Sequence, residues 1–193
     1  MLGQCSARDA ILTTPFKGVE VIPSSMALAA AELELADMRD RVMRLKEELV
    51  RVKGEYDFVL IDCPPSLGMV TLNALSACDS LIIPIQCEYY ALEGLSQLVT
   101  TVRQVKRLYN PGIEIEGVLL TMYDGRLNLT LQVVDEVKKY FPEKVFKNVI
   151  PRNVRLSEAP SFGQPVLYFD RSSRGSQAYE ALTAEILDKN RKG

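Results

Sequence analysis

One carboxylate of this chain lies where it could meet a phosphate group or a metal ion. Asp62 comes directly after the four apolar residues 58–61. A run that is apolar on every side is typical of a strand buried on both faces of a parallel sheet. The residue after the carboxyl end of such a strand faces the crevice where α/β folds bind ligands. Asp62 could therefore hold a hydrated Mg²⁺ ion through a water molecule, or it could simply end the strand and begin the next helix.

Other residues with useful chemistry also come after apolar segments. Pro64 and Pro65 stiffen the turn that leaves the first strand. Apolar segments at 80–85, 115–121 and 144–150 predict further strands. The residues after these segments are the next candidates for the site: Gln86 and Glu88, then Met122, then Pro151 and Asn153. For Glu88 the alternative is a charge at a helix N-terminus, and for 151–153 it is a plain turn.

Helices are predicted between these strands, and their alternation indicates the fold class. An α/β fold with a mostly parallel sheet flanked by helices is expected. In the longest helix, 26–52, an apolar stripe favours docking on the sheet over a coiled coil. Opposite charges one turn apart, Asp37 with Arg41 and Asp40 with Arg44, predict ion pairs on its exposed side. The other predicted elements are a strand at 18–24 and helices at 69–77, 90–109, 127–141 and 175–189.

Composition narrows the classes of function. The 193 residues are 47% hydrophobic and 25% charged, as in an ordinary globular domain. No apolar run approaches the roughly 20 residues of a membrane span. The chain has no histidine, the commonest zinc ligand. The four cysteines show no CxxC spacing, and three of them, Cys63, Cys78 and Cys87, lie in apolar or strand-like surroundings. Free thiols in a reduced, cytoplasmic protein are expected rather than an iron–sulfur site.

A net charge of −2 argues against bulk affinity for nucleic acid, so any DNA contact must come from a local basic patch. Five arginines in predicted loops could form one: Arg126, Arg152, Arg155, Arg171 and Arg174. Arginines on loops at one edge can bind phosphate groups without reading sequence. The alternative is that they pair with nearby acids, which are Asp124, Glu158 and Asp170.

Three long segments in the same order resemble one protein family. Residues 56–67 resemble the Walker B and switch II segment of the ParA/Soj-type chromosome and plasmid partitioning ATPases, within the MinD/ParA P-loop superfamily. The likeness continues at 84–94 and 151–161, and it covers about residues 19–187.

The resemblance implies roles for individual residues. Asp62 would support Mg²⁺ through water, and Met122, Pro151 and Asn153 would belong to the adenine pocket of an ATP site. Arg126 and Arg155 would contact DNA nonspecifically in an ATP-bound homodimer. The segments nearest the switch and the dimer partner would contain Pro64, Pro65, Gln86 and Glu88. The resemblance further implies a ParB/Spo0J-like partner that stimulates ATP hydrolysis, and a cytoplasmic, nucleoid-associated protein that segregates a chromosome or a plasmid.

The chain departs from the family pattern at one motif. It contains no Gly-x-x-x-x-Gly-Lys-Ser/Thr phosphate loop, so residues 1–193 are expected to form a single ParA-like domain without its N-terminal phosphate-loop portion. That absence argues against ATP hydrolysis, and against ATP and Mg²⁺ binding, by these residues alone. Residues 58–61 would then lack a neighbouring strand, which predicts a marginal or self-associating chain.

Two other functions compete with this one. A non-enzymatic adaptor of the same fold could bind DNA or a partner without nucleotide. A MinD-like positioning protein is disfavoured because residues 188–193 have no apolar face with which to bind a membrane.

Overall fold

The computed structural model describes residues 1–88 and 91–191, which form two compact units. The first unit contains residues 1–79 and 98–114, and the second contains 80–97 and the chain from 115 onward. One of the three boundaries between the units falls inside helix α5, Ala91–Leu108.

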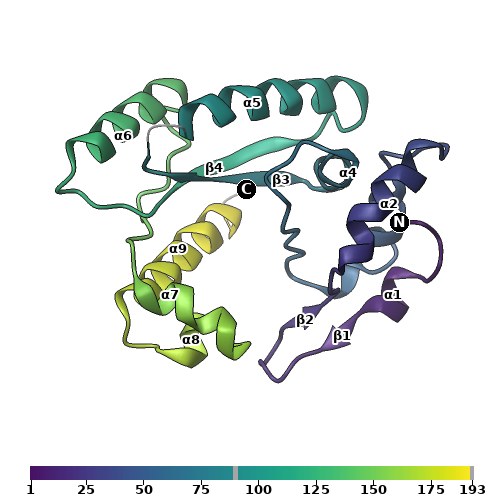
Figure 1. Cartoon of the computed structure of the whole chain (residues 1–193), viewed down its shortest axis with the longest axis horizontal. Helices are drawn as coiled ribbons and strands as arrows, with labels where there is room; N and C mark the ends of the chain where they lie inside the picture. The colour runs from purple at the N-terminus through teal and green to yellow at the C-terminus, as the bar shows by residue number, and fades with distance from the viewer. Residues whose placement is uncertain (89–90, 192–193) are drawn as a thin grey trace. The chain divides into compact units, whose positions relative to one another are not determined.

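The first unit is mainly helical (Figure 1). A short antiparallel hairpin pairs β1 with β2, with Leu12 opposite Val21. Asn110 joins the segment after α5 to this unit by donating to the carbonyls of Leu75 and Cys78, at 3.0 and 2.7 Å. The elements of residues 1–79 are α1 Ala7–Ala10, β1 Leu12–Thr13, β2 Glu20–Val21, α2 Met26–Ala36, α3 Arg44–Leu49, the 3-10 turn Lys53–Glu55 and α4 Met69–Ala77.

The single long helix predicted at 26–52 is wrong, because the chain breaks between α2 and α3. Asp40 has a left-handed backbone, with φ of 53°, which an α-helix cannot accommodate. Fully buried Asn73 on α4 satisfies the backbone at the break, since its amide donates to Arg41 O and its oxygen accepts from Leu45 N–H. The predicted apolar stripe still faces inward: Leu35, Val42 and Val52 are buried, and Met38, Leu45 and Leu49 are half-buried.

The ion pairs predicted on this helix do not form. Arg41 donates to the carbonyl of Ala36 at 2.6 Å, and Arg44 lies 3.7 Å from Glu47. The break explains both differences, because it removes the one-turn spacing on which the predicted pairs depended.

The predicted strand at 58–61 is also wrong. These residues belong to no strand, and Phe58, Val59 and Leu60 are 49%, 42% and 88% exposed. Within the described residues, the two named sheets pair only β1 with β2 and β3 with β4, so no strand offers this segment the hydrogen bonds that would make it one.

The second unit contains the parallel sheet. β3, Ser80–Gln86, lies beside β4, Glu114–Thr121, and the N–H of Cys87 donates to Thr121 O at 3.2 Å. The strand predicted at 144–150 exists only as two parallel bridges to the β4 segment, Val118 with Val145 and Tyr123 with Pro151. The remaining elements are α6 Asn128–Tyr140, α7 Val154–Glu158, the 3-10 turn Ala159–Phe162, α8 Val166–Phe169 and α9 Arg174–Arg191.

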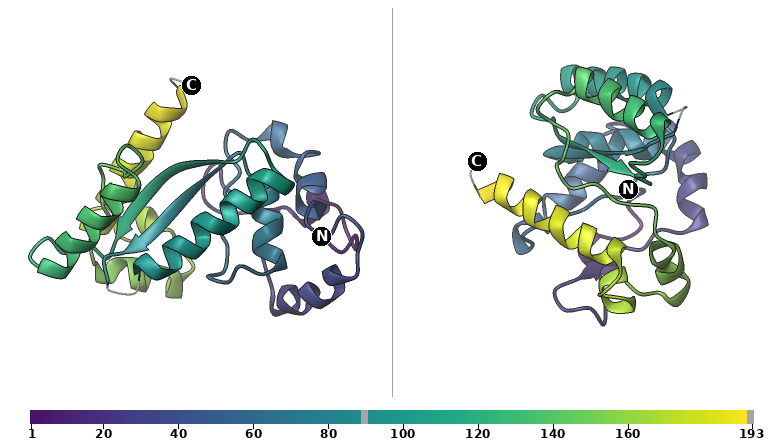
Figure 2. Two further views of the ribbon diagram at one scale, coloured as in Figure 1. Left: turned by 90° about the horizontal axis from the view of Figure 1, so that it is seen from above. Right: turned by 90° about the vertical axis from the view of Figure 1, so that its left-hand side faces the viewer.

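Helices cover both faces of this sheet, as the sequence predicts. Leu119 packs with Phe146, Ile150 and Leu182 on the α9 side. Its neighbour Leu120 faces the other way and packs with Cys87 and with Val134 of α6. Figures 1 and 2 show α6 and α9 on opposite sides of the strands. No described helix combines the length and the apolarity that a bilayer-crossing segment needs.

Candidate functional site

The candidate site of the second unit lies where β4 and the 145–151 segment end together. The N–H of Tyr123 donates to Ile150 O at 3.0 Å, and Tyr123 bridges Pro151. These bonds bring together Met122, Pro151 and Asn153, three residues that the sequence selects separately. Met122 has a left-handed backbone, with φ of 52°, and its side chain is 40% exposed. Such a backbone is rare for a long side chain and indicates a locally constrained turn.

Asn153 does two things at this edge. Its side-chain oxygen accepts from the N–H of Arg155 at 3.0 Å and so caps α7. Its amide NH₂ makes no hydrogen bond to the rest of the described chain, so it is free to donate to a ligand. Met122 and the half-buried Pro151 offer soft or flat apolar surface beside it. By their chemistry, side chains of these types could cover a flat heterocycle and donate to an acceptor on its edge.

An ion pair joins two loops at this edge. Glu88, after β3, accepts from Arg152 at 3.1 Å, and both side chains are more than half exposed. The ion pair is compatible with both simple alternatives, a charge before a helix for Glu88 and a turn for residues 151–153. Gln86, the last residue of β3, is exposed.

Four of the five arginines selected from the sequence are paired with acids. Arg126 donates to both oxygens of Asp124, at 2.9 and 2.7 Å. These hydrogen bonds lower the pKa of Asp124 to about 2. Arg155, which lies on α7 rather than in a loop, contacts Glu158 at 2.8 Å and Asp170 at 3.2 Å.

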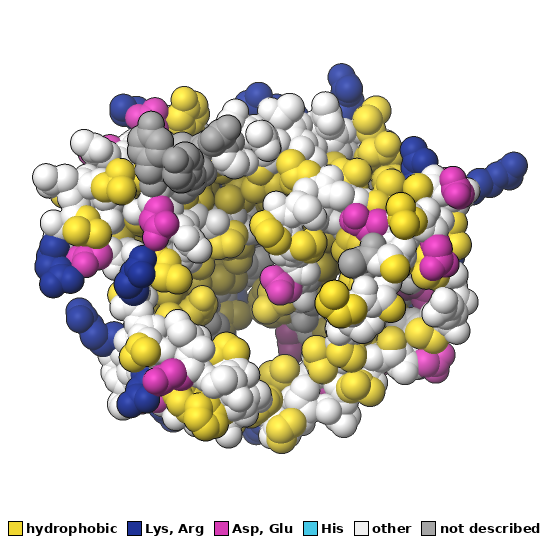
Figure 3. Space-filling model, viewed as in Figure 1, with side chains coloured by type: hydrophobic (Ala, Val, Ile, Leu, Met, Phe, Trp, Pro, Cys, Tyr) yellow, Lys and Arg dark blue, Asp and Glu magenta, His cyan; other side chains and the backbone are white. Residues whose placement is uncertain are grey.

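Pairing does not hide these cations. The Arg126 side chain is 88% exposed and that of Arg155 is 48% exposed, so both can still meet an anion. Figure 3 shows Lys or Arg side chains next to acidic and hydrophobic ones over α7 and α8. Arg171 lies 3.5 Å from Glu180, and Arg174 begins α9 instead of lying in a loop.

Asp62, the carboxylate after the first apolar run, belongs to the first unit. It is exposed and makes no hydrogen bond or ion pair among the described residues, and Pro64 and Pro65 are exposed as well. No group of three or more acidic or cysteine side chains within residues 1–88 and 91–191 could hold a metal ion directly. A lone solvated carboxylate fits a cation held through water, not one in a protein cage.

The cysteines are free thiols, as the sequence predicts, with one correction. Cys63 is exposed and belongs to no strand, although partial burial of its thiol raises its pKa. Burial raises the pKa of Cys78 to about 11 and raises that of Cys87, so these two thiols are poor nucleophiles at neutral pH.

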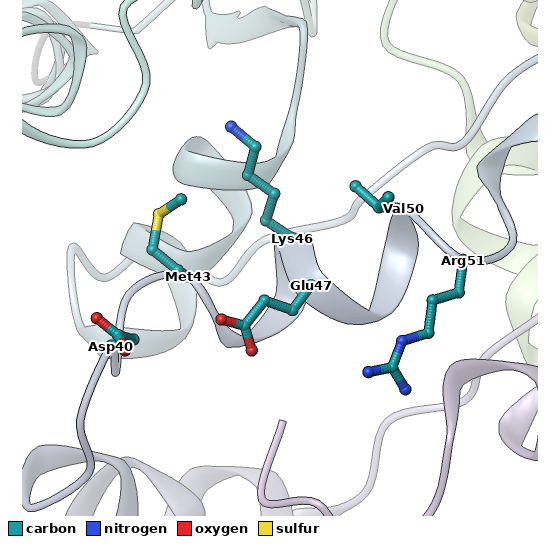
Figure 4. A pocket seen from close by; sticks show the side chains of 6 residues that line it. All are labelled: Asp40, Met43, Lys46, Glu47, Val50 and Arg51. Carbon is teal, nitrogen blue, oxygen red and sulfur yellow. The ribbon is translucent and has the colours of Figure 1, made fainter.

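The structure also has a shallow pocket of about 520 Å³ beside α3 in the first unit. Figure 4 shows Lys46 and Arg51 pointing away from each other, with Glu47 between them. Charged groups that diverge in this way cannot contact one small ligand together, so this pocket is a weak candidate for a ligand-binding site.

Comparison with known proteins gives consistent matches. A family model described as an AAA domain matches residues 1–115. Sporulation initiation inhibitor protein Soj of Bacillus subtilis is 57% identical over 178 residues, which cover 92% of this chain and 70% of that protein. Chromosome partitioning protein ParA of Myxococcus xanthus is 47% identical over 190 residues, covering 98% and 67%.

Among solved structures, cobyrinic acid a,c-diamide synthase of Mycobacterium smegmatis aligns with a TM-score of 0.81 and 33% identity, covering 96% of this chain and 69% of that one. A structure of that synthase with bound ADP and magnesium aligns with a TM-score of 0.73 and 36% identity, over 79% of this chain and 62% of that one.

Proposed function

This chain belongs to the ParA/Soj family of partitioning ATPases and has their P-loop NTPase type of α/β fold, and we propose that it binds adenine nucleotide and DNA in DNA segregation. The chain spans about 70% of the length of Soj. The site residues in this proposal come from the resemblance, and the geometry of each unit supports them separately.

The adenine-binding part is Met122, Pro151 and Asn153. The observation that carries it is the free NH₂ of Asn153 beside two apolar side chains, on backbone that the bridge from Tyr123 to Pro151 holds in place. Adenine presents a flat ring with acceptor nitrogens at its edge, which this arrangement can cover and bond. A related synthase whose structure contains ADP and magnesium supports an adenine nucleotide as the ligand.

Asp62 is the residue proposed to lie beside the metal ion. Bound Mg²⁺ would offset the negative charge of the nucleotide phosphates. Asp62 would hold such an ion through its water shell, and its lack of other partners in the described chain leaves the carboxylate available for that task. Pro64 and Pro65, with Gln86 and Glu88, are proposed for the switch and for contact with a second copy.

Arg126 and Arg155 are the proposed DNA contacts, in a protein that acts on the nucleoid with a ParB/Spo0J-like partner. Each is an exposed cation, and the guanidinium N–H groups that do not bond to an acid can donate to phosphate. Contacts of this kind bind any sequence, as partitioning requires.

Hydrolysis of ATP by residues 1–193 alone is not expected. A backbone cradle and lysine for the phosphates supply most of the catalysis in this reaction, and the 193 residues contain no Gly-x-x-x-x-Gly-Lys-Ser/Thr. The proposed contribution of this chain is therefore binding.

Calorimetric titration of the purified chain with Mg–ATP, alongside DNA-binding measurements, tests the proposal. Micromolar ATP affinity that falls about tenfold in Asn153→Ser is expected, because serine still caps α7 but has no amide to donate. Asn128→Ala, at an exposed position of α6, is the matched control and should bind as the unchanged chain does. No ATP affinity together with retained DNA binding would favour the adaptor function instead.

A further inference from the structure

Glu185 of α9 binds the backbone of the 145–151 segment at its one irregular point. One carboxylate oxygen accepts from Lys147 N–H at 2.9 Å. The other accepts from the backbone N–H and the side-chain amide of Asn148, at 3.1 and 2.7 Å. Desolvation opposes ionisation of Glu185, but these hydrogen bonds outweigh it and lower the pKa of the carboxyl group. Glu185 is thus a charged clamp at neutral pH.

The irregular point is a β-bulge. Between the two bridges the chain advances five residues on the β4 side, from Val118 to Tyr123, and six on the other, from Val145 to Pro151. The N–H of Ile150 donates to Leu120 O, where a regular parallel ladder would use the N–H of Asn148, so residues 146–149 bulge and the N–H of Asn148 has no strand partner. One extra residue on the β4 side, at Met122 with its left-handed backbone, makes the net difference one. Glu185 supplies acceptors to Lys147 and Asn148, the residues inside this interval.

The residues on both sides of the bulge are fixed to the same helix. Phe146 and Ile150 pack with Leu182 of α9, one turn before Glu185. The ammonium group of Lys189, one turn after Glu185, lies 4.2 Å from the centroid of the Phe146 ring. One face of α9 therefore holds the bulge and both of its apolar flanks.

The proposed adenine edge comes directly after the bulge in the chain. Ile150 donates to Leu120 O at 2.9 Å and accepts from Tyr123 N–H at 3.0 Å, and Pro151 and Asn153 come next. Phe146 and Ile150 both face α9, so the segment keeps its side-chain alternation up to Ile150, the residue before Pro151. The bulge thus sets the position along β4 at which Pro151 lies beside Tyr123 and Met122.

We propose that Glu185 is a positioning residue for base recognition, since it stabilises the bulge that sets the register of Pro151 and Asn153. The inference rests on the proposed adenine site, and it gives the last helix a role in nucleotide selectivity without any contact between that helix and the nucleotide.

The test uses the whole 193-residue chain and three variants, Glu185→Ala, Glu185→Gln and Asp188→Asn. Asp188→Asn is the matched control because it removes the same charge from an exposed site three residues along α9. Glu185→Gln keeps one acceptor oxygen, so it gives an intermediate effect and replaces Glu185→Ala if that variant does not fold.

Amide hydrogen exchange without nucleotide is the first measurement. Glu185→Ala should speed exchange roughly tenfold at Lys147 and Asn148, which lose an acceptor. It should also speed exchange several-fold at Tyr123 and Arg155, whose N–H groups bond to Ile150 and Asn153. A change confined to Lys147 and Asn148 would overturn the inference, because it would show that the adenine edge keeps its register without the clamp.

Base selectivity is the second measurement. The ratio of the Kd values for GDP and ADP should fall about fivefold in Glu185→Ala, less in Glu185→Gln, and not at all in Asp188→Asn. A loss of affinity that is equal for both nucleotides would overturn the inference, since general loosening affects both alike. If the unchanged chain binds neither nucleotide, the proposed adenine site fails, and hydrogen exchange at Tyr123 and Arg155 alone decides whether Glu185 sets the register.

Discussion

Asn73 shows how one polar side chain can decide the course of the backbone. It is fully buried, yet it bonds to Leu45, Arg41 and Met69 at 3.1, 2.7 and 3.0 Å. The first two bonds serve backbone groups that the break between α2 and α3 leaves without helical partners. Asn73 is therefore part of the reason that the chain turns where its apolar pattern alone would continue a helix.

Replacing Asn73 tests this role. Asn73→Ala should lower the free energy of unfolding by about 2–4 kcal/mol, because it leaves buried backbone groups unsatisfied. Urea denaturation followed by circular dichroism measures the change, and Asn128→Ala, at an exposed asparagine, should shift it by less than about 0.5 kcal/mol. Equal effects in the two variants would show that the bonds of Asn73 contribute little.

The pair of Asp124 and Arg126 predicts a specific response to pH. The pKa of Asp124 is lowered from 3.8 to about 2, so the folded state favours the ionised carboxylate. The stability that this provides is fully present above pH 3.8 and is lost as the pH falls through about 2. In an NMR titration, Arg126→Ala should move the pKa of Asp124 back toward 3.8, because its largest cause is the hydrogen bonds from Arg126. An unchanged pKa would contradict the pairing.

The same arginine has a predicted effect on DNA binding. Arg126→Ala should weaken nonspecific DNA binding about equally for all sequences. It should also reduce the slope of the logarithm of the binding constant against the logarithm of salt concentration by about one. Fluorescence anisotropy at several salt concentrations measures both quantities, and Arg103→Ala, on α5, is the comparison. An effect on only some DNA sequences would argue for base contacts instead.

At the scale of elements, the sequence predicts helices and strands best where a long segment is buried along its whole length or along one face. β3, β4, α5, α6 and α9 form close to their predicted bounds, because long apolar runs and long amphipathic stretches each allow one structure. Two predictions fail where a distant polar group intervenes, as Asn73 does at the α2–α3 break and Glu185 at the bulge. The predicted strand at 58–61 fails for another reason, because no described strand pairs with it. Periodicity carries no information about such partners.

The candidate site divides in the same way. The positions of Met122, Pro151 and Asn153 at strand ends are predictable from the apolar runs before them. The ion partners of Arg126 and Arg155 are close in sequence, and the sequence offers them as alternatives. The pairing of Glu88 with Arg152 spans 64 residues, so only the fold could show it.

Close packing of β4 against the bulged segment gives a prediction for Gly117. A Cβ added there would lie 2.5 Å from the Phe146 ring and 2.9 Å from the carbonyl oxygen of Lys144. Gly117→Ala should therefore destabilise the protein by about 2–3 kcal/mol in thermal or urea unfolding. Gly94→Ala has open space on α5 and should instead stabilise it by about 0.5–1 kcal/mol. Similar shifts in both variants would contradict the packing.

At the scale of the whole molecule, the exposed residues 58–60 predict self-association. Leu60 is 88% exposed on backbone that pairs with no described strand, and such segments favour contact with other chains. Sedimentation velocity should show a sedimentation coefficient that rises with concentration, and Leu60→Glu should reduce the rise. Leu33→Glu, at a site on α2 that is 79% exposed, should not. A monomer at all concentrations with one sharp unfolding transition would contradict this prediction.

The same segment should be cleaved readily by proteases, but the two fragments should stay associated after cleavage. Residues 58–64 have neither helical nor strand structure, so chymotrypsin should cleave first after Phe58 or Leu60. Pieces on either side of the cut would stay joined, because Glu32 accepts from Val70 N–H at 3.1 Å and Asn73 bonds to Arg41 and Leu45 across it. The nicked protein should therefore elute as one species in gel filtration and resolve into two fragments only in denaturant.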